Sequence, residues 1–235
     1  MRGNNLLVVA GVVVALCWNQ GPGAVAGDKT MDNLETTIVK LTKPRLKGEM
    51  SVEETLGRRR SVRNFSAQAL SLAEVSQLLW AAQGVTNEMG HRTAPSAGAT
   101  FPLACYLAAG AVEGLAPGLY LYRPAGHELE RMLAGDKRGA LAHAALNQHF
   151  IAEAPAVVVI AADFQRTTRR YGDRGRHYVF MEAGHAGQNV HLQCESLGLG
   201  TVCIGAFNER VVQKILEMAE EPLYLMPVGR KGTTR

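Results

Sequence analysis

The stretch Arg176–Phe207, RHYVFMEAGHAGQNVHLQCESLGLGTVCIGAF, joins a predicted long helix to a predicted strand through glycines. The helical part covers 176–197 and stops at Gly198, a residue type that commonly ends helices. Val202–Ile204 follows as a short predicted strand that ends at Gly205. The glycine fingerprint of a dinucleotide-binding fold follows a strand and opens a helix, and the order here is the reverse. The stretch therefore argues against a Rossmann site.

The rest of the chain predicts helices and strands in irregular order. Residues 71–82 begin with the capping box Ser71-x-x-Glu74, show one apolar helical face and stop at Gly84. The other predicted elements are helices at 136–150 and 208–219 and strands at 103–109, 119–122, 156–162 and 223–228. Because this order lacks strict βαβ alternation, we expect an α+β fold with a mixed or antiparallel sheet flanked by helices.

The composition indicates an ordinary globular domain. Of the 235 residues, 47% are hydrophobic and 20% are charged, which is enough apolar material for a sizeable core. The formal net charge is +4, and the basic excess lies in two arginine clusters at 58–63 and 166–176. Neither cluster alternates with aromatic residues, and no nucleic-acid-binding motif accompanies them. We therefore expect no nucleic-acid partner.

The N-terminus has the pattern of a secretory signal peptide. Arg2 supplies a positive charge, the apolar run Leu6–Trp18 follows, and Ala24-Val25-Ala26 fits a cleavage site. The run is short for the roughly 20 residues that cross a bilayer. The expected domains are a signal peptide at 1–26, a tether at 27–51 and a folded domain at 52–235. We expect an exported, periplasmic protein, with an uncleaved membrane anchor as the alternative.

No metal site is predicted. Cys105, Cys194 and Cys203 remain after signal cleavage, and an odd number without a CxxC pair argues against zinc or a disulfide scaffold. We expect buried free thiols, with a Cys194–Cys203 bridge as the alternative in an oxidising compartment. Glu182 and His185 resemble half of a di-iron site, but the second Glu-x-x-His is missing. Packing near an interface or a cofactor is the favoured interpretation for this pair.

Two segments predict contacts with a flat, anionic ligand. Arg58–Phe65, RRRSVRNF, clusters guanidinium groups around a hydroxyl, a combination that suits a phosphate dianion. Pro95–Pro102, PSAGATFP, places small residues between prolines, so that its backbone can lie against a planar molecule. Each could also be a plain surface loop, and Ser96 lacks the G-x-S-x-G surroundings of a hydrolase nucleophile. Pro227–Lys231 is a further candidate phosphate contact or a basic tail.

A set of short segments follows a fixed order along the folded domain. They are Arg59–Phe65, Arg92–Ala99, Gly118–Tyr122, Tyr171–Gly175, Glu182–Asn189, Leu197–Phe207 and Pro222–Gly229. Each is a weak signal alone, but the ordered set resembles the nitroreductase superfamily, and within it the SagB-type, azoline dehydrogenase-like branch. The resemblance covers about residues 52–230.

The resemblance implies FMN bound at the interface of a homodimer, with 176–197 as a long helix at that interface. The implied FMN contacts are Arg59, Arg60, Ser61 and Arg63 at the phosphate and ring edge, Pro95, Ser96, Ala97 and Gly98 as a wall from the second subunit, Gly205 and Ala206 as backbone donors near the reactive nitrogen, and Arg230 as a second phosphate contact. Because the flavin carries the chemistry, no catalytic side chain is expected.

The function implied by the resemblance is an FMN-dependent oxidoreductase. It would transfer hydride through the flavin from an NAD(P)H-like donor to a small organic acceptor such as a nitroaromatic or a quinone. Two alternatives remain at this point. One is a SagB-type dehydrogenase that oxidises azolines in a modified peptide, and the other is a flavin-binding redox protein without turnover.

Overall fold

The computed structural model describes residues 37–233, which form a seven-stranded sheet in the order β1-β4-β3-β2-β5-β7-β6. All neighbouring strands in this sheet pair antiparallel. The strands are β1 Ile38–Lys40, β2 Leu103–Ala109, β3 Gly118–Arg123, β4 Glu128–Ala134, β5 Ala156–Ala162, β6 Leu199–Thr201 and β7 Glu221–Arg230. The α+β prediction is confirmed, and the sheet is antiparallel rather than mixed.

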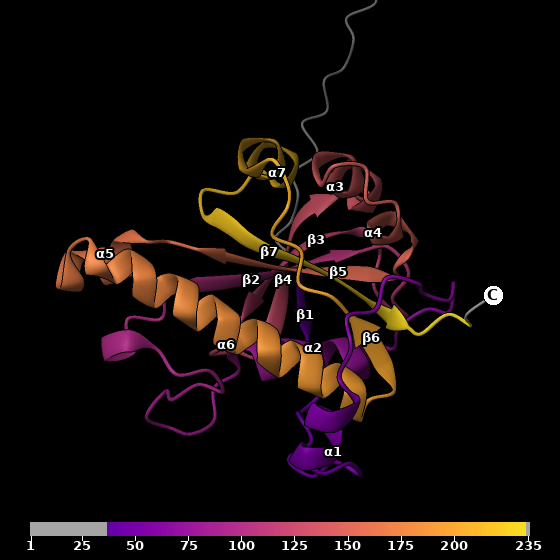
Figure 1. Ribbon diagram of the computed structural model, residues 1–235, viewed down its shortest axis with the longest axis horizontal. Coiled ribbons are helices and arrows are strands. Elements are labelled where there is room, and N and C mark those ends of the chain that lie inside the picture. The colour runs from indigo at the N-terminus through magenta and orange to yellow at the C-terminus, as the bar shows by residue number, and fades with distance from the viewer. Residues whose placement is uncertain (1–36, 234–235) are drawn as a thin grey trace, which may run out of the picture. The chain divides into compact units, whose positions relative to one another are not determined.

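Helices cover both faces of the sheet, with α2 and α6 on one side and α3, α4 and α7 on the other (Figure 1). The helices are α1 Val52–Arg58, α2 Leu72–Gln83, the short 3-10 helix η1 Ala97–Ala99, α3 Arg138–Ala144, α4 Phe150–Glu153, α5 Gln165–Tyr171, α6 Arg174–Ser196 and α7 Glu209–Leu216. β5 shows why two layers form: Val158 and Ile160 pack with α2 and α6, and Val157 and Val159 pack on the opposite face. Successive side chains of a strand point to opposite faces, so an uninterrupted apolar strand requires cover on both.

Helix α6 is the longest element of the described chain, with 23 residues and therefore a length of about 35 Å. Its buried side repeats at helical spacing through Val179, Ala183, Ala186 and Val190. Asn189 fixes it to α2, because its side-chain amide donates a hydrogen bond to the carbonyl oxygen of Ala81 at 3.0 Å. This helix provides the base on which the candidate site is built.

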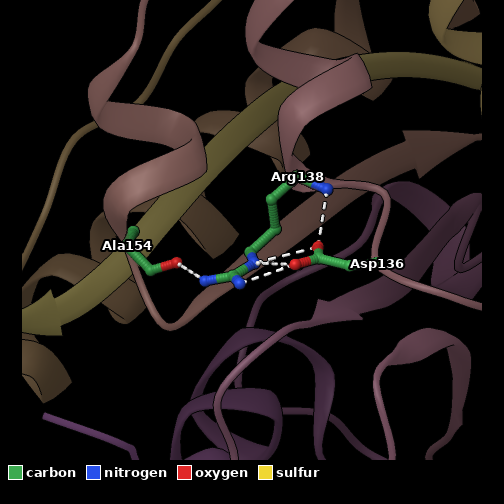
Figure 2. Close-up of polar contacts among 3 residues, drawn as sticks. All are labelled: Asp136, Arg138 and Ala154. Carbon is green, nitrogen blue, oxygen red and sulfur yellow. Dashed lines mark hydrogen bonds and ion pairs between the residues drawn. The ribbon is translucent and has the colours of Figure 1, made fainter. Parts of the chain in front are cut away.

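An arginine links the start of α3 to the end of α4. Arg138 forms an ion pair with Asp136 and donates from Nη1 to the carbonyl oxygen of Ala154 at 2.6 Å (Figure 2). The guanidinium lies against Gly110, at the end of β2, where an added Cβ would stand 1.8 Å from Cζ of the arginine. A larger residue at position 110 would therefore displace the Arg138 guanidinium from its contacts.

Two predicted elements differ from the structure. The strand predicted at 202–204 lies at 199–201 instead, and Ile204 forms only an isolated bridge with Leu225. The helix predicted at 136–150 is divided into α3 and α4, because Leu146 and Asn147 both adopt positive φ angles that a helix cannot contain.

The segment predicted as a tether, 27–51, contributes a strand in its described part, since Val39 in β1 pairs with Leu129 in β4. The signal peptide predicted at 1–26 lies outside the described residues. Among residues 37–233, no helix is both long and apolar enough to cross a membrane. The thiols of Cys105, Cys194 and Cys203 are free; Cys105 and Cys194 are buried as expected, whereas Cys203 is half-buried.

Candidate functional site

The arginine segment is held against the edge of the sheet. Helix α1 ends at Arg58, and the backbone N–H of Val62 then donates to the carbonyl oxygen of Thr201 in β6 at 2.9 Å. Gly200 allows this approach, because a Cβ at that position would lie 2.7 Å from Val62 Cβ. Phe65 makes a second bridge to Lys231, just after β7. The segment is therefore a fixed part of the fold rather than a free loop.

The side chains of the arginine segment provide positive charge that an anionic ligand can reach. Arg59 is half-buried, and Arg60, Ser61 and Arg63 are exposed. Within residues 37–233, Arg59 and Arg63 form no ion pair, whereas Arg60 donates to the carbonyl oxygens of Gly57 and Arg59. Unpaired guanidinium groups on a fixed backbone can bind an anion such as a phosphate.

Arg59 lies close to the C-terminal half of α6. Burial and, to a smaller extent, the charge of Arg59 lower the pKa of His191 to about 4, while Glu195 opposes the shift. Burial raises the pKa of the Cys203 thiol to about 11, and Arg59 opposes that shift. His191 is therefore uncharged near neutral pH and does not add to the cationic charge around Arg59.

Gly205 and Ala206 lie exposed on the turn between β6 and α7. Their backbone N–H groups have no hydrogen-bond partner among the described residues, although the Ala206 carbonyl oxygen accepts from Gln148 at 3.3 Å. The turn is anchored by the Ile204–Leu225 pair and borders Tyr224, whose Cε1 would be 4.0 Å from a Cβ on Gly205. Two exposed, unpaired N–H groups on an anchored turn can donate to a bound ligand.

The side chain of Arg230, at the end of β7, is already paired with another residue of the chain. Its Nη2 binds Oε1 of Glu74 in α2 at 2.7 Å, and its Nε is buried without a partner. Lys231 is likewise paired, with Glu195 of α6 at 2.8 Å. Direct phosphate binding by Arg230 stays a prediction, and the ion pair with Glu74 competes with it.

The Pro95–Gly98 turn lies next to the N-terminal half of α6. Ser96 Oγ accepts a hydrogen bond from the Phe101 backbone N–H at 2.9 Å, and Gly98 adopts a φ of 57°, which favours glycine. A cavity of about 270 Å³ opens between this turn and the helix. It is lined by Pro95, Ser96, Ala97, Tyr178, Met181, Glu182 and His185.

Glu182 is the chemically unusual member of this cavity. Its side chain is only 2% exposed, and its Oε1 atom has no hydrogen-bond partner. Burial raises the pKa of this carboxyl to about 7, and Ser96, Arg92 and Arg166 oppose the shift. The sequence singled out Glu182 and His185 only as an incomplete metal motif, and the described residues contain no cluster suited to a metal. Met181 gave no signal, because an apolar residue on a helix predicts packing.

The predicted residues therefore form two groups in one chain. Arg59 and Gly205 lie by the C-terminal part of α6 and the β6–α7 turn, and Ser96 lies by Glu182. Glu182 and His191 are nine residues apart, or about 13 Å along a helix. The cavity behind the Pro95–Gly98 turn includes neither Arg59 nor Gly205.

The chain is similar in sequence and structure to known proteins. The model of the nitroreductase family matches residues 56–230. The "Putative nitroreductase MJ1384" of Methanocaldococcus jannaschii is 52% identical over 183 residues, which are 78% of this chain and 92% of that protein. A crystal structure from Ralstonia eutropha JMP134, given the same description, superposes with a TM-score of 0.74 at 33% identity and covers 84% of this chain and 90% of its own. The trifolitoxin operon protein TfxC of Rhizobium leguminosarum bv. trifolii is 26% identical over 211 residues, which are 82% of this chain and 59% of that protein.

Proposed function

This chain belongs to the nitroreductase family of oxidoreductases, and on that premise we propose that it is an FMN-dependent enzyme. It passes hydride from an NAD(P)H-like donor to a small organic acceptor such as a nitroaromatic or a quinone. The proposal rests on two features that occur together. Arg59 and Arg63 carry cationic groups without an ion-pair partner among the described residues, and Gly205 and Ala206 offer N–H donors without a hydrogen-bond partner there. These are the two kinds of contact that a phosphorylated flavin needs.

The residues present fit FMN. Arg59 and Arg63 bind the phosphate, and the backbone N–H groups of Gly205 and Ala206 donate to the polar edge of the ring. Such donors favour negative charge on that edge and are already in place before the reaction. FMN, when bound, supplies the hydride chemistry, which is why no side-chain nucleophile is needed.

A homodimer supplies the other wall of the site. Pro95–Gly98 of a second copy closes the ring site, excludes water and leaves one ring face for substrates. The exposed apolar surface supports such an interface: Met181 of α6 is 52% exposed, and Val52 and Leu56 of α1 are 63% and 52% exposed. Apolar side chains of this size on adjacent helices are typical of a surface that is covered in an oligomer.

The two alternatives keep some support. The similarity to TfxC, a protein named for a toxin operon, favours the SagB-type dehydrogenase that oxidises azolines in a peptide. A flavin protein without turnover would share the same phosphate contacts. Export to the periplasm, proposed from residues 1–26, leaves the physiological electron donor to be identified by experiment.

The test is flavin binding and turnover by the purified protein. We expect a yellow protein that NADH bleaches and that regains its colour when a quinone or nitroaromatic is added. Arg59→Ala and Arg63→Ala should each weaken FMN binding by about 1.5–3 kcal/mol, because a charge-assisted contact is lost. The exposed Arg210→Ala variant in α7 is the matched control and should bind FMN normally.

A colourless protein without affinity for added FMN contradicts the proposal. Reduced flavin that small acceptors fail to reoxidise favours the protein without turnover. Loss of two mass units from an azoline peptide on incubation with the protein favours the peptide dehydrogenase.

A further inference from the structure

Tyr224 of β7 is a half-buried residue that takes no part in the FMN contacts proposed above. It pairs with Ile160 of β5, and the register between the two strands shifts directly beside this pair. Such a bulge redirects the neighbouring side chains and is frequent next to functional sites. Tyr224 packs against the layer of the core that contains α6, whereas Leu225 packs in the opposite layer. The Tyr224 ring therefore lies on the same face of the sheet as α6.

The ring of Tyr224 lies between α6 and the Gly205–Ala206 turn. Toward α6, its Cδ2 and Cε2 atoms would each be 3.7 Å from a Cβ at Gly187. Toward the turn, its Cε1 atom would be 4.0 Å from a Cβ at Gly205. Two glycines therefore face opposite edges of one aromatic ring, and a single added carbon on either of them would reach van der Waals contact with it.

The strand pairing gives the Gly205 N–H its direction. Ile204 and Leu225 exchange two backbone hydrogen bonds of 3.0 Å each. In an antiparallel pair, the next residue directs its N–H away from the partner strand, and here that residue is Gly205, opposite Tyr224. Because glycine has the greatest backbone freedom, a donor on it keeps one direction only where its neighbours hold it. Apart from the adjoining residues of the chain, the Tyr224 ring is the one described group within 4.0 Å of a Cβ at Gly205.

The Tyr224 hydroxyl takes no part in this packing. The hydroxyl of the buried Tyr106 donates to Glu220 at 2.8 Å, whereas that of Tyr224 has no hydrogen-bond partner within residues 37–233. The contacts toward Gly187 and Gly205 involve ring carbons only. A phenylalanine ring at position 224 would therefore reproduce them.

We propose that Tyr224 is the positioning residue of the Gly205–Ala206 turn. Its ring supports the turn against α6 and so keeps the two free N–H groups in place for the flavin contacts proposed above. The inference rests on the proposed function and adds to it the residue that sets the strength of these contacts. Because fixed N–H donors favour negative charge on the ring edge, a supported turn binds reduced flavin more tightly than a loose one does.

A matched pair of flavins tests this role. FMN and riboflavin share the ring system and differ in the phosphate, and each is titrated calorimetrically into flavin-stripped full-length protein. Tyr224→Leu, which removes the aromatic ring, should weaken the binding of both flavins by the same factor, about tenfold. Arg59→Ala should weaken FMN alone, because it acts on the phosphate. Tyr224→Phe keeps the ring and should restore the affinity for both.

The reduction potential of bound FMN separates positioning from a general loss of packing. It should be lower in Tyr224→Leu than in the wild-type protein, because displaced donors support less negative charge on the reduced ring, and unchanged in Tyr224→Phe.

A second variant disturbs the same ring from the side of α6. A Cβ at Gly187 would lie 3.1 Å from Cys203 Sγ and 3.7 Å from two carbons of Tyr224, so Gly187→Val crowds the ring. It should lower the affinity for both flavins and the potential, as Tyr224→Leu does. Gly139→Val in α3 is the matched control, because a Cβ there has no neighbour within 4 Å among the described residues. If Tyr224→Leu does not fold, the pair of valine variants decides.

Three results overturn the inference and leave the proposed function standing. The first is wild-type affinity and potential in Tyr224→Leu. The second is a Tyr224→Phe protein as weak as Tyr224→Leu, because the hydroxyl rather than the ring would then carry the effect. The third is a loss confined to FMN, which would place the effect at the phosphate. A wild-type protein that binds neither flavin overturns the proposed function first.

Discussion

Two ionisable residues on α6, Glu182 and His191, are buried. Burial raises the pKa of Glu182 and lowers the pKa of His191. The pKa of Glu182 is raised to about 7 from its ordinary 4.5, mainly by burial. The pKa of His191 is lowered to about 4 from 6.5, again mainly by burial, with Arg59 acting in the same direction. Burial disfavours the charged form of each group, so between about pH 4.5 and 6.5 the folded protein keeps Glu182 protonated and His191 neutral.

Their contributions to stability oppose each other as pH changes. Between about pH 4.5 and 6.5 the folded state holds a proton on Glu182 that the unfolded state has lost, so this residue lowers stability as pH rises. Over the same range the unfolded state holds a proton on His191 that the folded state lacks, so this residue raises stability as pH rises. Each acts with a slope of up to about 1.4 kcal/mol per pH unit, and the two largely cancel.

Two substitutions separate these contributions. Relative to wild type, Glu182→Gln should gain stability as pH rises from 4.5 to 6.5, and His191→Gln should lose it over the same range. Urea unfolding at half-unit pH steps measures both differences. The double variant should run parallel to wild type. Parallel curves for both single variants would show that neither group changes its pKa on folding.

The sequence predicted some individual residues of the candidate site and missed others. The arginine cluster predicted anion contacts at Arg59 and Arg63, and neither guanidinium group forms an ion pair within residues 37–233. The pairing of Arg230 with Glu74 joins residues 156 positions apart, and no local pattern records such a contact. The importance of Glu182 was equally hidden, because its burial depends on the Pro95–Gly98 turn packing against α6.

Among the elements, the short helices α3 and α4 depend on Arg138. They have seven and four residues, and the Arg138 side chain connects Asp136, before α3, with the carbonyl oxygen of Ala154, directly after α4. The arginine side chain is only 15% exposed, so its hydrogen bonds are poorly replaced by water. Its removal leaves the buried Ala154 carbonyl oxygen without this donor and leaves the Asp136 carboxylate only its bond from the backbone N–H of residue 138.

Arg138→Ala should therefore lower the free energy of unfolding by about 1.5–3 kcal/mol, measured by urea denaturation. The control is Arg123→Ala, whose side chain is 50% exposed and pairs with Glu130 across the surface of the sheet. Exposed pairs of this kind contribute about 0–1 kcal/mol. Equal losses in the two variants would contradict a special role for Arg138.

Element prediction succeeded where one local signal dominated. β5 is a continuous apolar run, and α2 has a capping box and a glycine stop, so both were found with nearly their true bounds. β4 was missed because only Leu129 among its residues is buried, which leaves no alternating apolar pattern. β1 has three residues and is a strand only because β4 lies beside it.

On the scale of the whole molecule, the fold could be predicted from ordered motifs, but the composition of the site could not. Arg59 lies near His191 and Ser96 near Glu182, and the cavity beside Ser96 includes no residue of the arginine segment. In the proposed site, Arg59, Arg63 and Gly205 of one copy share a flavin with the Pro95–Gly98 turn of another. This arrangement is the central claim.

Mixed dimers of two defective chains test that claim most directly. One chain carries Arg59→Ala with Arg63→Ala. The other carries Ala97→Trp, whose side chain occupies the space next to the Pro95–Gly98 turn. The homodimer of each variant should bind FMN weakly. In a mixed dimer isolated with two affinity tags, one site has both defects and the other has none. The account predicts one tightly bound FMN per mixed dimer. A mixed dimer without any tightly bound FMN would mean that each chain builds its site alone, and would contradict the account.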